Sequence, residues 1–374
     1  MVRLTFYPLG NADTCLIDFQ NGRKMLVDYA HCRSGEEESD LRIDLRSKLI
    51  EDLEEADRDW YDVVAFSHAD DDHVRGASDF FYFDHAKKYQ GAGRAKIAEL
   101  WVPASMVLEQ NLDGDAGVIR AEARHRLRQG AGIRVFSRPS KLTEWFKAES
   151  LDPSSRERLM TDAGQLVPGF TTNADGVEFF VHSPFAFRDG EGLQDRNEGS
   201  LVLHVTFTVE GRTTCCMLGA DTPCERWTDV VNITLGHNRD ERLVWDVFKL
   251  PHHCSYLSLS PDKGKNKTEP VPAVKWLFDQ GRPGGIIVSP SDPIPANDDN
   301  SQPPHRQAAN YYRDVVATID GDFVVTMEHP KKSRPEPLVI EIGGAGALLK
   351  KSLLGAGPIA SLQPTPRAGG VGGC

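Results

Sequence analysis

The chain has 374 residues, of which 40% are hydrophobic and 26% charged, and its formal net charge at pH 7 is −12. This composition is ordinary for a globular protein. No run reaches the roughly 18 apolar residues that a membrane span needs, and the net acidity argues against indiscriminate binding to nucleic acid. The N-terminus lacks the layout of a signal peptide and the seven cysteines form no CxxC pair, so we expect a cytoplasmic protein with reduced thiols and no membrane association.

The first part of the chain predicts short strands, one helix and one buried strand. Strands are expected at 2–7, 15–19 and 24–28, where β-branched, apolar and aromatic residues alternate with turn residues. Apolar residues at helical spacing predict an amphipathic helix over 39–56. The run DVVAFS at 62–67 is typical of a strand buried on both faces, and it leads directly into the sequence HADDDH.

The region 80–165 is less regular, and we expect a largely helical insertion there. Three roles stay open for it: a lid over substrate, a surface for a partner, or filler. Its later part is locally basic, which suggests a phosphate-binding track within an acidic protein. The basic residues are Arg120, Arg124, Arg126, Arg128, Arg134, Arg138, Lys141, Lys147, Arg156 and Arg158.

The second half returns to strands, and its alternation of strands and helices suggests two sheets packed together with helices outside. His182, inside one strand, is expected in the core or at the surface rather than at a metal. Residues 344–374 are rich in Gly and Pro, so we expect one domain over 1–343 and a disordered tail. Strands are expected at 177–183, 200–209, 213–219, 244–250 and 284–289, then a helix at 304–318 and a final hairpin at 322–327 and 337–342.

The strongest chemical signal is the segment from His68 to His73, which follows the end of the buried strand. His68, Asp70, Asp72 and His73 place four potential metal ligands within six residues. Imidazole and carboxylate both bind zinc or manganese, and carboxylate-rich sets favour the harder ions. The alternative is a charged turn whose aspartates are solvated and cap the following helix.

Two later strands end in residues of the same kind. One strand ends at Asp221 and another at His252 and His253. Each feature alone has an ordinary explanation, since a single aspartate can cap a helix and paired histidines are often surface residues. Three clusters of ligand type at strand ends together favour a metal centre, because loops at strand ends are where a rigid scaffold presents functional groups.

These segments resemble a known superfamily. HADDDH is similar to the HxHxDH signature of the metallo-β-lactamase superfamily, with Asp70 where the second histidine usually stands. This variant resembles the nuclease-like domain of ComEC-type DNA-uptake proteins. The resemblance covers about residues 2–340 in order, interrupted by the insertion. It includes LGNADTCLI with MLVD in the first 28 residues, NEGSLVL with GAD, LPHHCS, and the late pair Pro304-His305.

The resemblance implies an α+β fold, the αββα metallo-β-lactamase sandwich, with two mixed sheets, outer helices and metals at one edge. It implies one or two divalent ions, zinc or manganese. By position, His68 and Asp70 would serve the first metal, Asp72, His73 and His253 the second, and Asp221 would bridge them. Asp13, Asp28 and Asn197 would lie around these ligands and orient them.

The expected activity is metal-dependent hydrolysis, with a phosphodiester of a nucleic acid or nucleotide as the preferred substrate and a metal-activated hydroxide as nucleophile. Asp72 is the expected catalytic residue at the metal, and His252 or His305 the expected proton donor. The stretch Lys263, Lys265 and Lys267 is a candidate for binding phosphate. Two alternatives stay open: hydrolysis of a small ester, lactone or lactam, and a non-catalytic interaction protein with a degenerate site.

Overall fold

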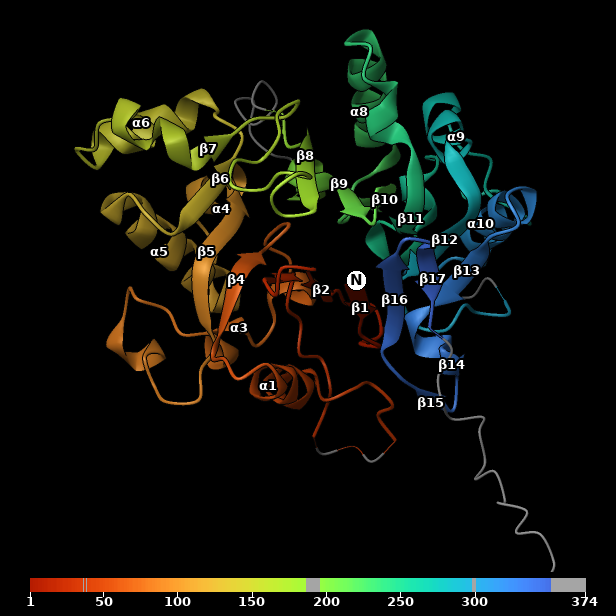
Figure 1. Ribbon diagram of the computed structural model, residues 1–374, viewed down its shortest axis with the longest axis horizontal. Helices are drawn as coiled ribbons and strands as arrows, with labels where there is room; N and C mark the ends of the chain where they lie inside the picture. Colours follow the sequence, from red (N-terminus) through yellow and green to blue (C-terminus); the bar gives the residue numbers. More distant parts are fainter. Residues whose placement is uncertain (36, 38, 186–195, 298–300, 351–374) are drawn as a thin grey trace, which may run out of the picture.

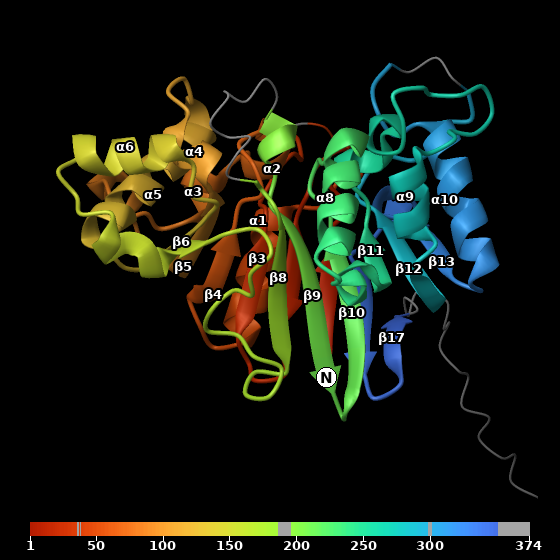
Figure 2. The ribbon, with the colours of Figure 1, turned by 90° about the horizontal axis from the view of Figure 1, so that it is seen from above.

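The computed structural model describes residues 1–35, 37, 39–185, 196–297 and 301–350. Two β-sheets pack face to face, and helices cover their two outer faces (Figure 1). Figure 2 shows the helices α5 (Gly114–Gln129) and α6 (Ser140–Ala148) on one side of the sheets and α8 (Cys224–Gly236), α9 (Pro272–Phe278) and α10 (Arg306–Thr318) on the other. The predicted arrangement of two mixed sheets with outer helices is confirmed.

The larger sheet is antiparallel at one end and parallel at the other. Within the described residues its order is β17-β16-β1-β2-β3-β4-β5-β6-β7, and every pair from β3 to β7 is parallel. The strands are β1 (Val2–Phe6), β2 (Cys15–Asp18), β3 (Lys24–Val27), β4 (Trp60–Ala65), β5 (Lys96–Pro103), β6 (Ile133–Phe136), β7 (Met160–Thr161), β16 (Leu338–Gly343) and β17 (Gly346–Leu349).

The smaller sheet has the same division. Its order is β13-β12-β11-β10-β9-β8, with antiparallel pairing from β8 to β10 and parallel pairing from β10 to β13. The strands are β8 (Val177–Ser183), β9 (Val202–Val209), β10 (Arg212–Leu218), β11 (Trp245–Lys249), β12 (Gly281–Ser289) and β13 (Asp322–Val325).

Three hydrophobic clusters hold the four layers together. The central one fills the space between the sheets with side chains such as Phe6, Trp101 and Phe179, all at most 1% exposed. A second packs α1 (Leu45–Glu55), α3 (Ala77–Phe80), α5 and α6 on the larger sheet, and a third packs α8, α9 and α10 on the smaller one. Because apolar residues face both sides of each sheet, the central strands read as nearly continuous apolar runs.

Three expectations from the sequence differ from the structure. The region 80–165 contains α4 (Ala104–Leu108), α5 and α6, but it also adds β5, β6 and β7 to the larger sheet and is therefore not largely helical. The segments at 322–327 and 337–342 form no hairpin, since β13 pairs with β12 and β16 pairs with β1 in the other sheet. The predicted tail begins with β17, and residues 351–374 lie outside the described part of the chain.

Among the described residues, no helix combines the length and the apolar character that a membrane crossing requires.

Candidate metal centre

The site lies where the C-terminal ends of parallel strands from both sheets meet. Asp28 follows β3, His68 follows β4, Asp221 follows β10, His253 follows β11, and Pro290 follows β12. Loops at the carboxyl ends of parallel strands meet at one edge, which is where open α/β sheets bind ligands. The helical turn α2 (Asp71–Val74) begins directly after Asp70.

Several of these loops have backbone in the left-handed region, which non-glycine residues rarely adopt. Asp28 has φ +59°, Ala220 has φ +44°, and the run of His252, His253 and Cys254 has φ +48°, +49° and +66°. The His252 N–H donates to the Ala220 carbonyl at 3.1 Å and joins two of the loops. Strained backbone of this kind is concentrated at functional sites, where the surrounding structure holds it in place.

Four side chains form a compact ligand cluster. Asp72, His73, Asp221 and His253 each offer one ligand atom, and these atoms lie within 4.8 Å of one another. His73 Nε2 lies 3.1 Å from Asp221 Oδ1, and His253 Nε2 lies 3.1 Å from Asp72 Oδ2 and 3.8 Å from Asp221 Oδ2. His73, Asp221 and His253 are buried, whereas the Asp72 side chain is 36% exposed and faces solvent. The structure thus joins residues from three distant segments.

In both histidines of the cluster, Nδ1, the ring nitrogen opposite the ligand atom Nε2, lies beside a hydrogen-bond acceptor. His73 Nδ1 lies 2.9 Å from Asp28 Oδ2, and His253 Nδ1 lies 2.8 Å from the carbonyl of Pro290. A carboxylate and a carbonyl only accept hydrogen bonds, so both rings carry their proton on Nδ1. Each Nε2 therefore presents a lone pair to the centre.

His68 is oriented through a relay. The Ser67 hydroxyl donates to Asp28 Oδ2 at 2.8 Å, and the Ser67 N–H donates to Asp28 Oδ1 at 2.7 Å. Because the hydroxyl hydrogen of Ser67 is donated to Asp28, Ser67 Oγ accepts a hydrogen bond from His68 Nδ1 at 3.0 Å. The His68 Nε2 lone pair is thereby turned inward, and the His68 and His73 rings lie 4.0 Å apart between centroids. Asp28 fixes two histidines at once.

The donor set fits a bound cation. His68 Nε2, His73 Nε2 and Asp221 Oδ1 are buried atoms without a hydrogen-bond partner. Lone pairs on imidazole nitrogen and carboxylate oxygen facing each other at 3.1 Å need a positive charge between or beside them. Burial favours the neutral forms, but the ring of His73 holds the pKa of Asp221 well below its usual range. Against the same desolvation, Asp221 and Asp28 raise the pKa of His73. Without a metal ion, a proton on His73 Nε2 would therefore occupy the place beside Asp221 that the ion would take.

A buried ion pair lies beneath the ligands. Lys249 Nζ is 2.5 Å from Asp13 Oδ2, and both side chains are 2% exposed. Burial raises the pKa of Asp13 although Lys249 opposes the shift. Asp13, Asp28 and His73 also lie close enough to form a ligand-type group. Sequence reasoning missed Lys249, because a lysine at the end of an apolar strand reads as a surface residue.

Asp70 faces an arginine instead of the ligand cluster. Arg196 Nη1 lies 2.9 Å from Asp70 Oδ1, and Arg196 Nη2 lies 2.7 Å from Glu109 Oε1. Asp70 Oδ2 is 3.6 Å from His68 Nε2. Arg196 and Asn197 belong to the short helical turn Arg196–Gly199, and the Leu201 N–H that follows donates to the Ser67 carbonyl. Arg196 and Glu109 were not predicted from the sequence.

The two histidines expected to donate protons have different surroundings. His305 is 3% exposed, its Nε2 donates to the Ser301 carbonyl at 3.3 Å, and its Nδ1 accepts from the Tyr256 N–H at 3.4 Å. Burial lowers the pKa of His305. His252 is only partly buried and lies beside His253, with ring centroids 6.3 Å apart. Backbone groups therefore engage both ring nitrogens of His305, whereas His252 is a partly buried neighbour of the ligand His253.

The predicted phosphate-binding lysines do not point to one place. Lys267 Nζ pairs with Asp314 Oδ2 at 3.1 Å on α10. The loop backbone is held to the same helix, because Gln307 Nε2 donates to the Lys265 carbonyl at 3.2 Å. Lys263 is close enough to His305 to contribute to the lowering of its pKa. Lys263 thus lies near His305, one of the two expected proton donors.

The arginines of the insertion are used by the fold. Arg126 pairs with the fully buried Glu122 at 2.6 Å. Arg120, Arg124, Arg156 and Arg158 donate to backbone carbonyls, and Arg128 and Arg138 pair with carboxylates. These contacts do not support the expected phosphate track.

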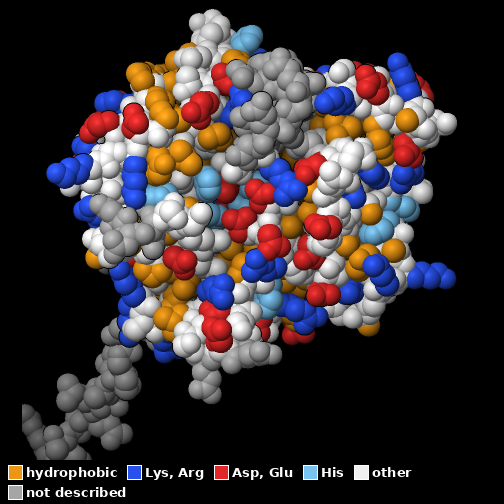
Figure 3. Space-filling model, turned by 180° about the vertical axis from the view of Figure 1, so that it is seen from behind, with side chains coloured by type: hydrophobic (Ala, Val, Ile, Leu, Met, Phe, Trp, Pro, Cys, Tyr) orange, Lys and Arg blue, Asp and Glu red, His pale blue; other side chains and the backbone are white. Residues whose placement is uncertain are grey.

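A cleft of about 500 Å³ opens beside the ligand cluster, and Asp72 is one of its walls. Its walls carry both charges: the cations Arg42, Arg75 and Lys332, and the carboxylates of Glu37, Asp40, Asp72 and Asp292. Each of the three cations is in an ion pair with a neighbouring carboxylate. Asp292 lies opposite, and burial raises the pKa of its carboxyl. Figure 3 shows acidic, basic and histidine side chains close together on one face, with no continuous basic track over its described part.

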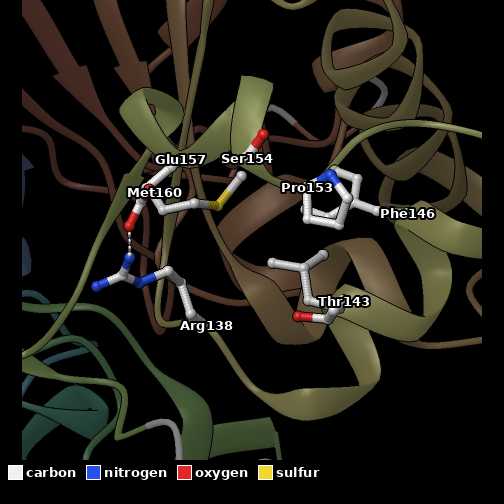
Figure 4. A pocket seen from close by; sticks show the side chains of 8 residues that line it. Arg138, Thr143, Phe146, Pro153, Ser154, Glu157 and Met160 are labelled. Atoms are coloured by element: carbon white, nitrogen blue, oxygen red, sulfur yellow. Dashed lines mark hydrogen bonds and ion pairs between the residues drawn. The ribbon is translucent and has the colours of Figure 1, made fainter.

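Another cavity, of about 240 Å³, lies on the outer helical layer between α6 and the turn Ser154–Leu159 (Figure 4). Phe146, Pro153 and Met160 line it, together with the ion pair between Arg138 and Glu157. It shares no residue with the ligand cluster or the cleft.

No protein-family model and no curated protein matches the chain by sequence. Among solved structures, the chain is similar to a protein from Parabacteroides distasonis described as a metal-dependent hydrolase, at 10% identity and a TM-score of 0.35, over 86% of this chain and 92% of that one. It is also similar to a diphosphatase from the PhnP family, at 11% identity and a TM-score of 0.28, over 77% and 86%. Likenesses this distant carry no conclusion about activity.

Proposed function

We propose that the protein is a metal-dependent hydrolase of the metallo-β-lactamase type that cleaves phosphodiesters. The observation that carries the proposal is the convergence of the Nε2 atoms of His73 and His253 on Asp72 and Asp221. The Nδ1 atoms of these two rings and of the neighbouring His68 are fixed by Asp28, Pro290 and Ser67. A charged turn or a degenerate scaffold has no need for three fixed tautomers. The resemblance of HADDDH, GAD and LPHHCS to the superfamily points the same way.

Asp72, His73, Asp221 and His253 would hold the ion, with His68 and Asp70 beside them. A divalent cation bound there supplies a Lewis acid that lowers the pKa of water and offsets charge on a phosphoryl oxygen. Two nitrogens and two carboxylates suit manganese or zinc. The sequence expected one or two such ions.

The residues of the chain supply orientation and charge. Asp28 and Pro290 hold the histidines so that the centre is formed before substrate arrives, which reduces the reorganisation that the reaction requires. His252 is our proposed proton donor to the leaving oxygen, in preference to His305, because backbone groups engage both ring nitrogens of His305.

The cleft favours a small anionic substrate. Its volume of about 500 Å³ lies within the range typical of sites for small ligands. Arg42, Arg75 and Lys332 lie along its walls, each paired with a carboxylate, so an anionic group of the substrate would share these cations with their present partners. Because the arginines of the insertion are engaged elsewhere, we propose a nucleotide or a short phosphodiester in preference to long nucleic acid.

The test is hydrolysis of bis-p-nitrophenyl phosphate, a dinucleotide and linear DNA by metal-free protein supplied with manganese, zinc or magnesium. We expect turnover that requires metal and that Asp72→Ala abolishes. Asp79→Ala is the matched control, since Asp79 is an exposed aspartate of the next helix, and it should retain activity.

The remaining outcomes are equally informative. Turnover of lactone or ester panels by protein that binds metal but leaves every phosphodiester intact would correct the substrate class. Protein that binds no divalent ion would contradict the proposal as a whole.

A further inference from the structure

The ligand cluster is asymmetric. Asp72, His73, Asp221 and His253 form a complete group of four ligands on one side. On the other side stand His68 and Asp70, and among the described residues neither joins a group of three or more ligand-type side chains. Four protein ligands are typical of a tightly held ion, whereas two leave an ion mostly to water.

A guanidinium already neutralises the second side. Arg196 Nη1 is 2.9 Å from Asp70 Oδ1, so one of the two carboxylate oxygens that would hold a second ion is taken. Asp70 and Arg196 are about equally exposed, at 33% and 38% of their side chains, and the pair lies at the mouth of the centre. An arginine cannot lose its proton in a protein, so this positive charge is permanent.

Glu109 holds the guanidinium in position. It accepts from Arg196 Nη2 at 2.7 Å and from Arg196 Nε at 3.0 Å, a two-point contact that fixes the plane of the group. Glu109 follows α4, which the insertion places beside β5. Asp70 and Glu109 both raise the pKa of Arg196 by accepting its hydrogen bonds. The insertion thus delivers the anchor for a fixed cation next to His68.

We propose that Arg196 takes the place of a second metal ion, so that the centre binds one divalent cation, through Asp72, His73, Asp221 and His253. This inference rests on the proposed function, because it assumes that the ligand cluster binds metal. A second dication on Asp70 and His68 would be only a few ångströms from the guanidinium and would be repelled by it. Arg196 then provides a permanent positive charge beside the site where a phosphoryl oxygen would bind.

The experiment counts manganese ions bound to metal-free, full-length protein by calorimetric titration and elemental analysis, with electron paramagnetic resonance of the loaded protein. We expect one tight equivalent per chain and the six-line spectrum of an isolated Mn²⁺ ion. Asp70→Asn should keep that equivalent. In Arg196→Gln, a second equivalent should bind at least about tenfold more tightly than in the unchanged protein, because the repulsion is gone.

Arg138→Gln is the control, since Arg138 is also an arginine paired with two carboxylates but lies on the outer helical layer. If Arg196→Gln does not fold, Glu109→Gln releases the same guanidinium with a smaller change. Two tight ions and a spin-coupled spectrum in the unchanged protein would overturn the inference while leaving the proposed function intact. Loss of the single ion in Asp70→Asn, or no second ion in Arg196→Gln, would also overturn it. No bound manganese, zinc or magnesium would contradict the proposed function itself.

Discussion

Each histidine of the centre is oriented by a group on the side of the ring that faces the protein. Asp28 is the most consequential of these groups, because it accepts from His73 Nδ1 at 2.9 Å and from the Ser67 hydroxyl at 2.8 Å. Through Ser67 it also determines the tautomer of His68. At this scale, we expect the affinity for metal to depend on Asp28, which is not one of the four proposed ligands.

Asp28→Asn tests this dependence. The amide keeps the size of the side chain but removes the negative charge that orients His73 and makes it a stronger ligand. Loss of such a partner typically costs about 10- to 100-fold in metal affinity, and we expect a loss of that order in a calorimetric titration with manganese or zinc. Asp59→Asn is the control, because Asp59 makes an exposed ion pair with Lys96. Equal affinities in the two variants would contradict the role given to Asp28.

Sequence reasoning at the residue scale named the candidate ligands and expected Asp28 to orient them, but it missed Arg196 and the Pro290 carbonyl. His68, Asp70, Asp72 and His73 are contiguous and follow a strand, so their proximity is a local property. Arg196 reaches Asp70 from 126 positions away, and the Pro290 carbonyl reaches His253 from 37 positions away. Contacts of this kind are set by the packing of the two sheets, and no local pattern reports them.

At the scale of elements, the insertion shows that a basic composition does not by itself identify a phosphate-binding surface. α5 carries four arginines, yet Arg126 lies against the larger sheet, where its side chain is 7% exposed and that of Glu122 is 0% exposed. Arg126 also donates to the carbonyls of Ile97 and Gly132. The strands β5 to β7 were missed because they are short or interrupted by polar residues. They are strands because β5 pairs with β4, β6 with β5 and β7 with β6.

A pair of substitutions separates the structural arginines from the exposed ones. Arg126→Met removes the guanidinium from the buried Glu122, which would keep only its contacts with His85, and we expect a loss of up to about 3–5 kcal/mol in the free energy of unfolding. Arg128→Met removes an exposed pair with Glu149, in which Arg128 is 46% exposed, and should cost at most about 1 kcal/mol. Urea unfolding measures both values. Similar losses in the two variants would show that burial does not decide the role of these residues.

Two buried histidines on strands β8 and β9 allow a second test, which concerns the pH dependence of stability. His182 Nε2 donates to the Arg242 carbonyl and His204 Nε2 to the Val244 carbonyl, each at 2.9 Å. Burial lowers the pKa of His182 to about 4 and that of His204 to about 3. The pKa of each histidine in the folded protein is thus below its unfolded value of about 6.5, so the folded protein favours the neutral ring. The contribution of each neutral histidine to the free energy of unfolding is present above about pH 6.5 and is lost as the pH falls below it.

We therefore expect the free energy of unfolding to fall by about 4 kcal/mol between pH 8 and pH 5 because of these two histidines. The double variant His182→Gln and His204→Gln retains a hydrogen-bond donor but does not titrate, so its stability should change less over the same range. Urea unfolding at both pH values gives the comparison, with the exposed His237→Gln as control. An unchanged pH dependence in the double variant would exclude these two residues as its source.

At the scale of the whole molecule, two sheets of different size bring their parallel ends to one edge, and this arrangement collects Asp28, His73, Asp221 and His253 from positions up to 225 residues apart in the chain. The layered architecture was suggested by the alternation of strands and helices and was implied by the resemblance to the metallo-β-lactamase superfamily. The partners of individual strands did not, since β13 and β16 are neighbours in the predicted hairpin but belong to different sheets. Register and sheet membership depend on the whole set of strands.

The charge of the molecule sets the last expectation. The net charge is −12, and the cations that line the cleft are few. A substrate that contacts about one or two positive side chains should show a slope of about −1 in the logarithm of kcat/KM against the logarithm of salt concentration, because each neutralised phosphate of a single strand contributes about −0.7. We expect this shallow slope for a dinucleotide and for single-stranded DNA alike. The salt range is about 50 to 200 mM NaCl, which brackets the physiological ionic strength. Arg42→Gln should flatten it further. A slope several-fold steeper with long DNA, and unaffected by Arg42→Gln, would reveal a phosphate-binding track elsewhere on the surface and restore long nucleic acid as the substrate.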